Sequence, residues 1–160
     1  MTSALTVLRA RVDNRLVHGQ ILEAWVPALG ADAIVVADDD VAASLLMRSA
    51  MSIAVPRKVR LVFTRIADAR ATLEVNGPGA ALVLFRDVAD AVRARDAGLP
   101  LPALDIGNVH FAPGRRPVTP SIFLSDAELA ELEKLSAAGV HVEVRTLPSD
   151  PARPVPARAP

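Results

Sequence analysis

The 160-residue sequence contains no cysteine, and its 18 basic side chains are balanced by 18 acidic ones. The absence of cysteine excludes disulfides, thiolate chemistry and zinc sites built on thiolates. A net charge of zero gives no electrostatic reason to expect a nucleic acid or an anionic membrane as a partner. Any site for phosphate must therefore be formed by a local group of residues rather than by the overall charge of the protein.

Long apolar segments are also missing. No apolar stretch approaches the ~20 residues that a membrane-spanning helix needs. The first apolar run differs from a signal peptide, because Arg9, Arg11 and Asp13 interrupt it. We therefore expect a cytoplasmic protein.

Apolar residues are abundant, at 51% of the chain, which is enough for one well-buried domain. Short strand-like runs alternate with helix-like ones, a pattern typical of a parallel sheet with helices on both faces. Several strand candidates are uninterrupted apolar runs, as expected for strands buried on both sides. The predicted strands cover residues 5–12, 33–37, 59–64, 80–85, 103–106, 121–124 and 140–145, and the predicted helices cover residues 19–29, 41–54, 66–75, 87–97 and 126–138.

These elements predict a single-domain α/β fold with a mostly parallel open sheet of about seven strands. Residues 111–120 contain three prolines and a glycine, so we expect a loop there, followed by an antiparallel strand at an edge of the sheet. Residues 149–160 are rich in Pro, Ala and Arg. We expect them to form a flexible tail after a domain of residues 1–148.

Residues 13–20, Asp-Asn-Arg-Leu-Val-His-Gly-Gln, join the first predicted strand to the first predicted helix. Such a turn is where an open α/β sheet builds its site, and a helix that begins there points unpaired backbone N–H groups at an anion. His18 in this turn can hold a phosphoryl group, or it can simply cap or pack at the helix start. Gly19 favours the first interpretation, because its missing side chain leaves room for a partner's active site.

The neighbours of His18 suit phosphoryl transfer. Arg15 can offer a fork of donors to phosphate oxygens, although an arginine here can also be a solvated surface residue. Asp13 can accept a hydrogen bond from one ring nitrogen and so fix the tautomer, or it can stabilise the turn as a helix-start acid. Gln20 can contact phosphate or lie on the first helical turn, and the sequence leaves both roles open.

The motif Asp-x-Arg-Leu-x-His-Gly-Gln, followed shortly by Trp25, closely resembles the IIB component of the mannose/sorbose class of the bacterial sugar phosphotransferase system. The similarity extends through about residues 5–150. Its other parts are the strand and acidic turn at residues 34–42, the strand at 82–85, the Asp-Ile-Gly-Asn turn at 105–108 and the closing segment at 135–148.

The resemblance implies that His18 is the residue that is phosphorylated. It also implies an enzyme IIA phosphohistidine as the donor, a sugar entering through membrane IIC and IID subunits as the acceptor, and no metal or cofactor. The chain would be cytoplasmic, and peripheral at the inner face of the membrane where it meets IIC and IID. The sugar stays unnamed, because selectivity in such systems resides chiefly in the membrane subunits. No pattern in the sequence fixes homo-oligomerisation.

Three positions depart from the family pattern. Asn14 replaces an acid that is common in the motif, Asn108 replaces a glycine after Gly107, and His110 stands where an apolar or aromatic residue is usual. We count Asn14 among the residues that position the phosphoryl group, and Gly107, Asn108 and His110 as additional candidates. For His110 the hypothesis is that a second histidine at the sheet edge touches the phosphoryl group or titrates with it.

Arg86 directly follows the predicted strand 80–85, so it would lie on the same sheet edge as His18 and is a candidate second phosphate ligand. The acidic run at residues 38–40 can suggest magnesium, but acids between a strand and a helix more often form a capping turn. Trp25 is predicted to pack in the core. Charges that could dock a partner, or simply face solvent, are Arg9, Arg11, Arg57, Lys58, Arg115 and Arg116.

Two other functions compete with sugar transport. In the first, a IIB-like relay carries the phosphoryl group on His18 to a regulatory partner, and neighbouring IIC and IID genes would be absent. In the second, the same turn holds a phosphorylated metabolite without covalent chemistry. A pure binding site would more naturally use a Gly-rich turn than a histidine followed by one glycine.

Overall fold

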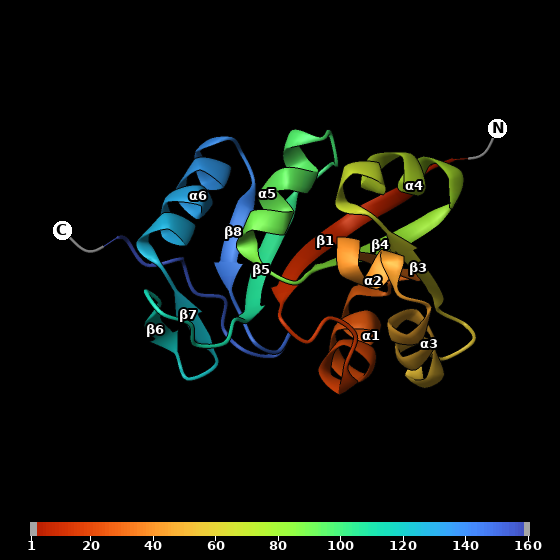
Figure 1. Ribbon diagram of the computed structural model, residues 1–160, viewed down its shortest axis with the longest axis horizontal. Helices are drawn as coiled ribbons and strands as arrows, with labels where there is room; N and C mark the ends of the chain where they lie inside the picture. Colours follow the sequence, from red (N-terminus) through yellow and green to blue (C-terminus); the bar gives the residue numbers. More distant parts are fainter. Residues whose placement is uncertain (1–2, 159–160) are drawn as a thin grey trace.

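The protein, described here by a computed structural model of residues 3–158, is built on one six-stranded parallel sheet (Figure 1). The strands lie in the order β3-β2-β4-β1-β5-β8, and every neighbouring pair is parallel. Their bounds are β1 (Leu5–Asp13), β2 (Ala33–Ala37), β3 (Arg60–Thr64), β4 (Gly79–Phe85), β5 (Ala103–Asn108) and β8 (His141–Val144).

Helices cover the two faces of the sheet in separate groups. Because parallel crossovers are right-handed, a connection that moves toward β3 puts its helix on one face and a connection that moves toward β8 puts it on the other. The first group comprises η1 (Ile21–Trp25), α1 (Val26–Leu29) and α3 (Leu45–Ala54) on the back face, and α2 (Asp39–Ala43), which begins at the carboxyl end of β2 and buries Val41 in the same core. The second, on the front face, comprises η2 (Ile66–Asp68), α4 (Ala69–Val75), α5 (Val88–Asp96) and α6 (Asp126–Ala137).

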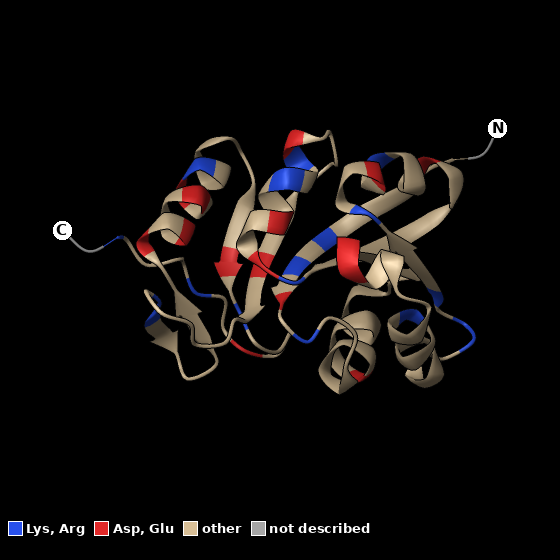
Figure 2. Ribbon diagram, in the orientation of Figure 1, with Lys and Arg blue, Asp and Glu red and all other residues tan. Residues whose placement is uncertain are grey.

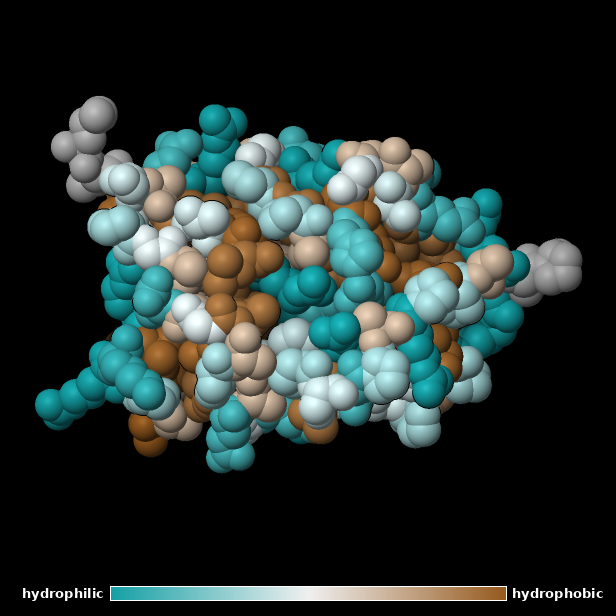
Figure 3. All heavy atoms as spheres, turned by 180° about the vertical axis from the view of Figure 1, so that it is seen from behind, coloured by the Kyte–Doolittle hydropathy of each residue, from teal (hydrophilic) through white to brown (hydrophobic). Residues whose placement is uncertain are grey.

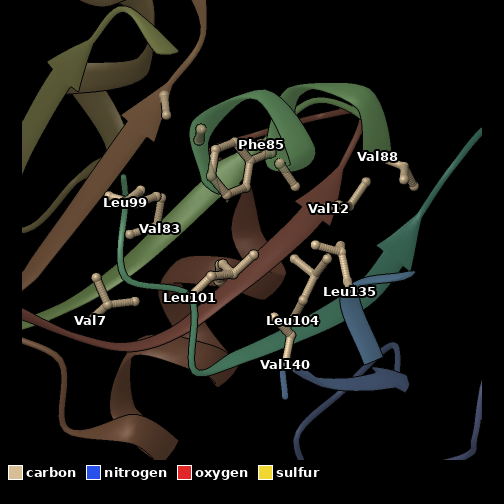
Figure 4. Packing of buried hydrophobic residues seen from close by; sticks show 14 of the residues in the cluster. Val7, Val12, Val83, Phe85, Val88, Leu99, Leu101, Leu104, Leu135 and Val140 are labelled. Atoms are coloured by element: carbon tan, nitrogen blue, oxygen red, sulfur yellow. The ribbon is translucent and has the colours of Figure 1, made fainter. Parts of the chain in front are cut away.

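The front face carries the larger hydrophobic core. Val12 of β1 and Phe85 of β4 pack there with Val88 of α5, and Leu104 of β5 packs with Leu135 of α6 (Figure 4). All five side chains are at most 4% exposed. Fully burying one large apolar side chain stabilises a fold by about 1.5–3 kcal/mol, so this layer fixes the strand order on which the site depends.

The back face is apolar over only part of the sheet. Its core joins the first helix group to β2 and β4 and includes no residue of β5 or β8. Over β1, β5 and β8 the back face carries charge instead: Arg9 pairs with Asp105 at 2.6 Å and with Glu143 at 3.4 Å. Figure 2 shows these blue and red bands on the strands, and the view from behind shows hydrophilic surface at its centre beside hydrophobic areas (Figure 3).

The predicted α/β fold with a mostly parallel sheet is confirmed, and two details differ from the expectation. The segment 111–120 contains β6 (Arg116–Thr119), which pairs antiparallel with β7 (Ile122–Leu124). The antiparallel strand therefore lies in this separate hairpin rather than in the main sheet. The predicted helix 41–54 is two helices, because Ser44 adopts an extended conformation and caps α3 by accepting a hydrogen bond from the Met47 N–H.

Residues 151–158 run along the outer side of β8. Arg153 and Val144 exchange two backbone hydrogen bonds, at 2.8 and 3.1 Å, and Val155 packs against the front core. Arg158 lies 3.3 Å from Glu133 of α6. The tail thus has specific contacts with the domain, and its flexibility stays a prediction.

Candidate functional site

The residues singled out in the sequence meet at the carboxyl edge of the sheet. After β1 the chain turns to the back face and enters η1 and α1, whereas after the neighbouring β4 it turns to the front face and enters α5. Open α/β sheets bind ligands at such a switch point, because the two diverging loops leave a crevice between them. His18 lies in the first loop, and Arg86 begins the second.

The loop after β1 is held in shape by its own polar atoms and one buried side chain. The Asp13 carboxylate accepts a hydrogen bond from the Arg15 N–H at 3.0 Å, and the Asp13 carbonyl accepts one from the Leu16 N–H at 3.0 Å. Leu16 is 1% exposed and has a φ of 56°, a backbone conformation that residues other than glycine rarely adopt. Burial of Leu16 therefore holds a strained turn that carries His18 to the crevice.

His18 makes its hydrogen bond to Asp13 through one ring nitrogen. Its Nε2 lies 2.7 Å from Asp13 Oδ2, and the side chain is 13% exposed. Burial acts to raise the pKa of Asp13, but hydrogen bonds from His18, Asn108 and the Arg15 backbone outweigh it and hold that pKa below its usual value. An ionised carboxylate only accepts hydrogen bonds, so Nε2 carries the proton of this contact, and in the neutral imidazole the lone pair is then on Nδ1.

Asp13 is itself fixed by two further residues. Asn108 Nδ2 donates to Asp13 Oδ2 at 2.8 Å, and Arg11 Nε lies 3.8 Å from the same oxygen. Burial lowers the pKa of Arg11 to about 10, although the charges of Asp13 and Asp105 act in the opposite direction. Arg11 is therefore a buried cation at neutral pH, and its charge balances that of Asp13.

Arg11 is held from three sides. It donates to the carbonyls of Arg145 and Thr146, at 2.6 and 2.7 Å, and it lies 4.6 Å from the ring centre of Trp25. A Cβ placed on Gly107 would come within 2.1 Å of an Arg11 nitrogen. Gly107 thus serves the site by making room for the guanidinium.

Sequence reasoning missed the role of Arg11. It counted Arg11 among charges that could dock a partner, and this was wrong, because the side chain is fully buried. The available signal was strand alternation: Arg11 and Asp13 are two residues apart on β1 and so share a face. Trp25 is buried as predicted, and its indole N–H also donates to the Thr146 carbonyl at 3.0 Å.

Arg15 and Gln20 lie on the open side of the loop. Arg15 Nη2 donates to Gln20 Oε1 at 3.1 Å, and the Arg15 side chain is 44% exposed. A side chain on Gly19 would meet nothing within 4 Å, which shows that this position faces open space. The exposed side chain of Arg15 and the backbone at Gly19 are thus accessible from outside.

Arg86 reaches toward the end of β2, and its side chain is partly exposed. It donates to both carboxylate oxygens of Asp38, at 2.9 and 3.3 Å, and this pairing raises the pKa of Arg86. Asp38 also accepts from the Val41 N–H at 2.9 Å, so the acidic run begins with a helix cap, the capping use that the sequence favoured. The proposed phosphate contact of Arg86 stays a prediction.

Asn14 connects the ends of β1, β4 and β5 through hydrogen bonds. Its side chain donates to the Arg86 carbonyl at 2.7 Å and accepts a hydrogen bond from the His110 N–H, and its own N–H donates to the Asn108 carbonyl at 2.9 Å. His110 is thereby tied to the site through its backbone, and its carbonyl accepts from Arg115. The hypothesis that the His110 ring meets the phosphoryl group stays a prediction.

None of the helices among residues 3–158 combines the length and the apolar composition that a membrane span requires. The fold and the site define a class: an open α/β protein that presents a histidine, fixed by a carboxylate, at its switch point. Residues 7–157 match the family described as the PTS system sorbose subfamily IIB component. The chain belongs to that family and is a IIB component of the sorbose/mannose class, whose members are phosphotransferases.

Relatives of known specificity cover nearly the whole chain. The fructose-specific EIIB component of Bacillus subtilis is 32% identical over 149 residues, 91% of each chain. The N-acetylgalactosamine-specific IIB component 1 of Escherichia coli is 29% identical over 160 residues, 98% of this chain and 99% of that one. The IIBSor domain of the sorbose permease from Klebsiella pneumoniae superposes with a TM-score of 0.83 at 25% identity, covering 92% of each chain.

Proposed function

We propose that Nδ1 of His18 accepts a phosphoryl group from a phosphohistidine of an enzyme IIA and passes it to a sugar that enters through membrane IIC and IID subunits. The observation that carries the proposal is the 2.7 Å contact between His18 Nε2 and the buried Asp13 carboxylate. This contact occupies one ring nitrogen and makes the other the nucleophile. We propose that the transfer to the sugar takes place at the cytoplasmic face of the membrane, where those subunits are.

The transfer exchanges one nitrogen–phosphorus bond for another. The lone pair of Nδ1 attacks phosphorus as the bond to the donor imidazole breaks, and the donor ring, protonated on its other nitrogen, leaves as neutral imidazole. The His18 ring becomes cationic, and its Nε2 proton stays between the ring and Asp13. The energies of the two bonds are similar, so the protein has to supply in-line positioning and compensation for charge.

The charge on the transferred group can be met by residues on the open side of the loop. Arg15 lies there with its side chain partly exposed, and its Nη2 donates to Gln20 Oε1 at 3.1 Å. A planar guanidinium offers two parallel donors to phosphoryl oxygens. The backbone N–H groups of Gly19 and Gln20, at the start of the helical segment, would add to this charge compensation.

The test is intact-mass analysis after incubation with phosphoenolpyruvate, the general phosphotransferase proteins and an enzyme IIA, comparing the natural chain with His18→Ala. We expect one acid-labile phosphoryl adduct that is lost in the variant. His141→Ala is the matched control and keeps the adduct, because His141 begins β8 at the opposite edge of the sheet. An adduct that survives in His18→Ala and disappears in His110→Ala would overturn the assignment.

A further inference from the structure

We infer that Asn108 is a positioning residue that sets how strongly Asp13 stabilises phosphorylated His18, and hence how readily this chain gives its phosphoryl group away. The inference rests on the proposed function of His18. Its basis is that one oxygen, Asp13 Oδ2, accepts two hydrogen bonds: one from His18 Nε2 at 2.7 Å and one from Asn108 Nδ2 at 2.8 Å.

The Asp13 carboxylate and its amide donor Asn108 are shielded from water. Asp13 is fully buried and Asn108 is 7% exposed. Hydrogen bonds to a charged group inside a protein are stronger than in water, and donors on one acceptor oxygen compete for its charge. Asn108 therefore weakens the pull of Asp13 on the Nε2 proton of His18.

The competition matters most in the phosphorylated state. When phosphorus is bound to Nδ1, the ring is cationic, and the Nε2–H···Oδ2 contact becomes an interaction between opposite charges. A carboxylate that has given part of its charge to Asn108 stabilises this cation less. Phospho-His18 thus lies higher in free energy, and transfer onward to the next acceptor is favoured.

The backbone of Asn108 fixes this geometry. Its carbonyl accepts the Asn14 N–H at 2.9 Å, in the loop that begins directly after Asp13. Residue 108 also pairs with Asp13 in the register of β5 against β1, next to an irregularity between Val12 and Asp13. The amide is accordingly held against Asp13 by the sheet itself.

The experiment measures the equilibrium ratio of phosphorylated to free protein against a phosphorylated enzyme IIA, approached from both directions, for the natural chain, Asn108→Ala and Asn108→Gly. We expect the ratio to rise about three- to tenfold in both variants, because Asp13 then serves His18 alone. An equilibrium ratio reached from both directions does not respond to slower binding or slower transfer. Asn76→Ala is the matched control, since its side chain also donates one hydrogen bond, but to the Thr72 carbonyl at the end of α4.

A second readout uses the unphosphorylated protein and keeps this inference separate from the proposed function. In Asn108→Ala the Nε2-bound proton of His18 should resonate further downfield by NMR, because its hydrogen bond to Asp13 is stronger. If the natural chain takes no phosphoryl group, the proposed function fails, whereas this spectral shift still tests Asn108. A ratio within twofold of the natural one, a fall in the ratio, or an unchanged Nε2–H resonance would each overturn the inference.

Discussion

Asp13 and Asp38 occupy equivalent places at the ends of β1 and β2, but their carboxylates bind different side chains. Each carboxylate accepts a backbone N–H of the turn that follows it, from Arg15 and from Val41. The second oxygen of Asp13 binds the imidazole of His18, whereas that of Asp38 binds the guanidinium of Arg86. Imidazole has another nitrogen with a lone pair, and guanidinium has none. The partner, rather than the acid, therefore distinguishes the site that we propose to carry the phosphoryl group from a structural ion pair.

Removing the charge of Asp13 should have the largest effect on phosphorylation. Asp13→Asn keeps the size of the side chain but leaves no anion to stabilise a cationic His18 ring. We expect the rate of phosphorylation to fall by about 10²- to 10⁴-fold. Rapid-quench measurement of the phosphorylated fraction gives that rate. A rate within threefold of the natural chain would show that the first carboxylate, like the second, is only structural.

Disturbing the support of Asp13 should have the next largest effect. Gly107→Ala would place a Cβ at 2.1 Å from an Arg11 nitrogen, so the buried guanidinium has to move. We expect the free energy of unfolding to fall by about 1–3 kcal/mol, with slower phosphorylation at full occupancy of the folded state. Urea denaturation measures the first and rapid quench the second. Gly19→Ala, where the new Cβ meets nothing within 4 Å, is the stability control.

The corresponding change at Asp38 tests whether this second carboxylate is only structural. Asp38→Asn removes the anion that caps α2 and binds Arg86, so we expect the free energy of unfolding to fall by about 1–2 kcal/mol. The phosphorylation rate of the folded protein should stay within about threefold of the natural value. A rate loss as large as that of Asp13→Asn would mean that both acids belong to the reacting site.

The smallest expected effect is a change in stability on replacing Asp90, which lies on α5 near Asp38. Burial, with the nearby charges of Asp87 and Asp38, raises the pKa of Asp90 to about 6. Between the ordinary pKa of an aspartate and about 6 the folded state binds more protons than the unfolded state, so this group makes the fold less stable as pH rises. Asp90→Asn should therefore stabilise the protein by about 1 kcal/mol at pH 7.5 and by less at pH 4.5. Thermal unfolding at the two pH values checks the sign, and an equal change at both would contradict it.

Local patterns were sufficient for the strands of the main sheet and for the position of His18 in the turn after β1. Residues 33–37 and 80–85 are continuous apolar runs, and a strand buried on both faces requires little else. The break between α2 and α3 was missed, because Ser44 is an ordinary residue inside an apolar run and acts as a cap only through its extended backbone. A single serine carries no periodic signal.

The contacts that complete the site are long-range. Asn108 reaches Asp13 across 95 positions of the chain, and Arg11 reaches the Thr146 carbonyl across 135. Such contacts depend on the order of β1, β5 and β8 in the sheet, and the sequence predicted the strands without their order. The buried state of Arg11 follows from that order, so reading it as a surface charge was a natural error.

The most direct test of the account is the position of the phosphorus on His18, read by NMR of the phosphorylated protein labelled with ¹⁵N in its histidines. Because Asp13 holds Nε2, we predict a bond to Nδ1, with Nε2 still protonated. Phosphorus on Nε2, or on a residue other than His18, would contradict the role given to Asp13.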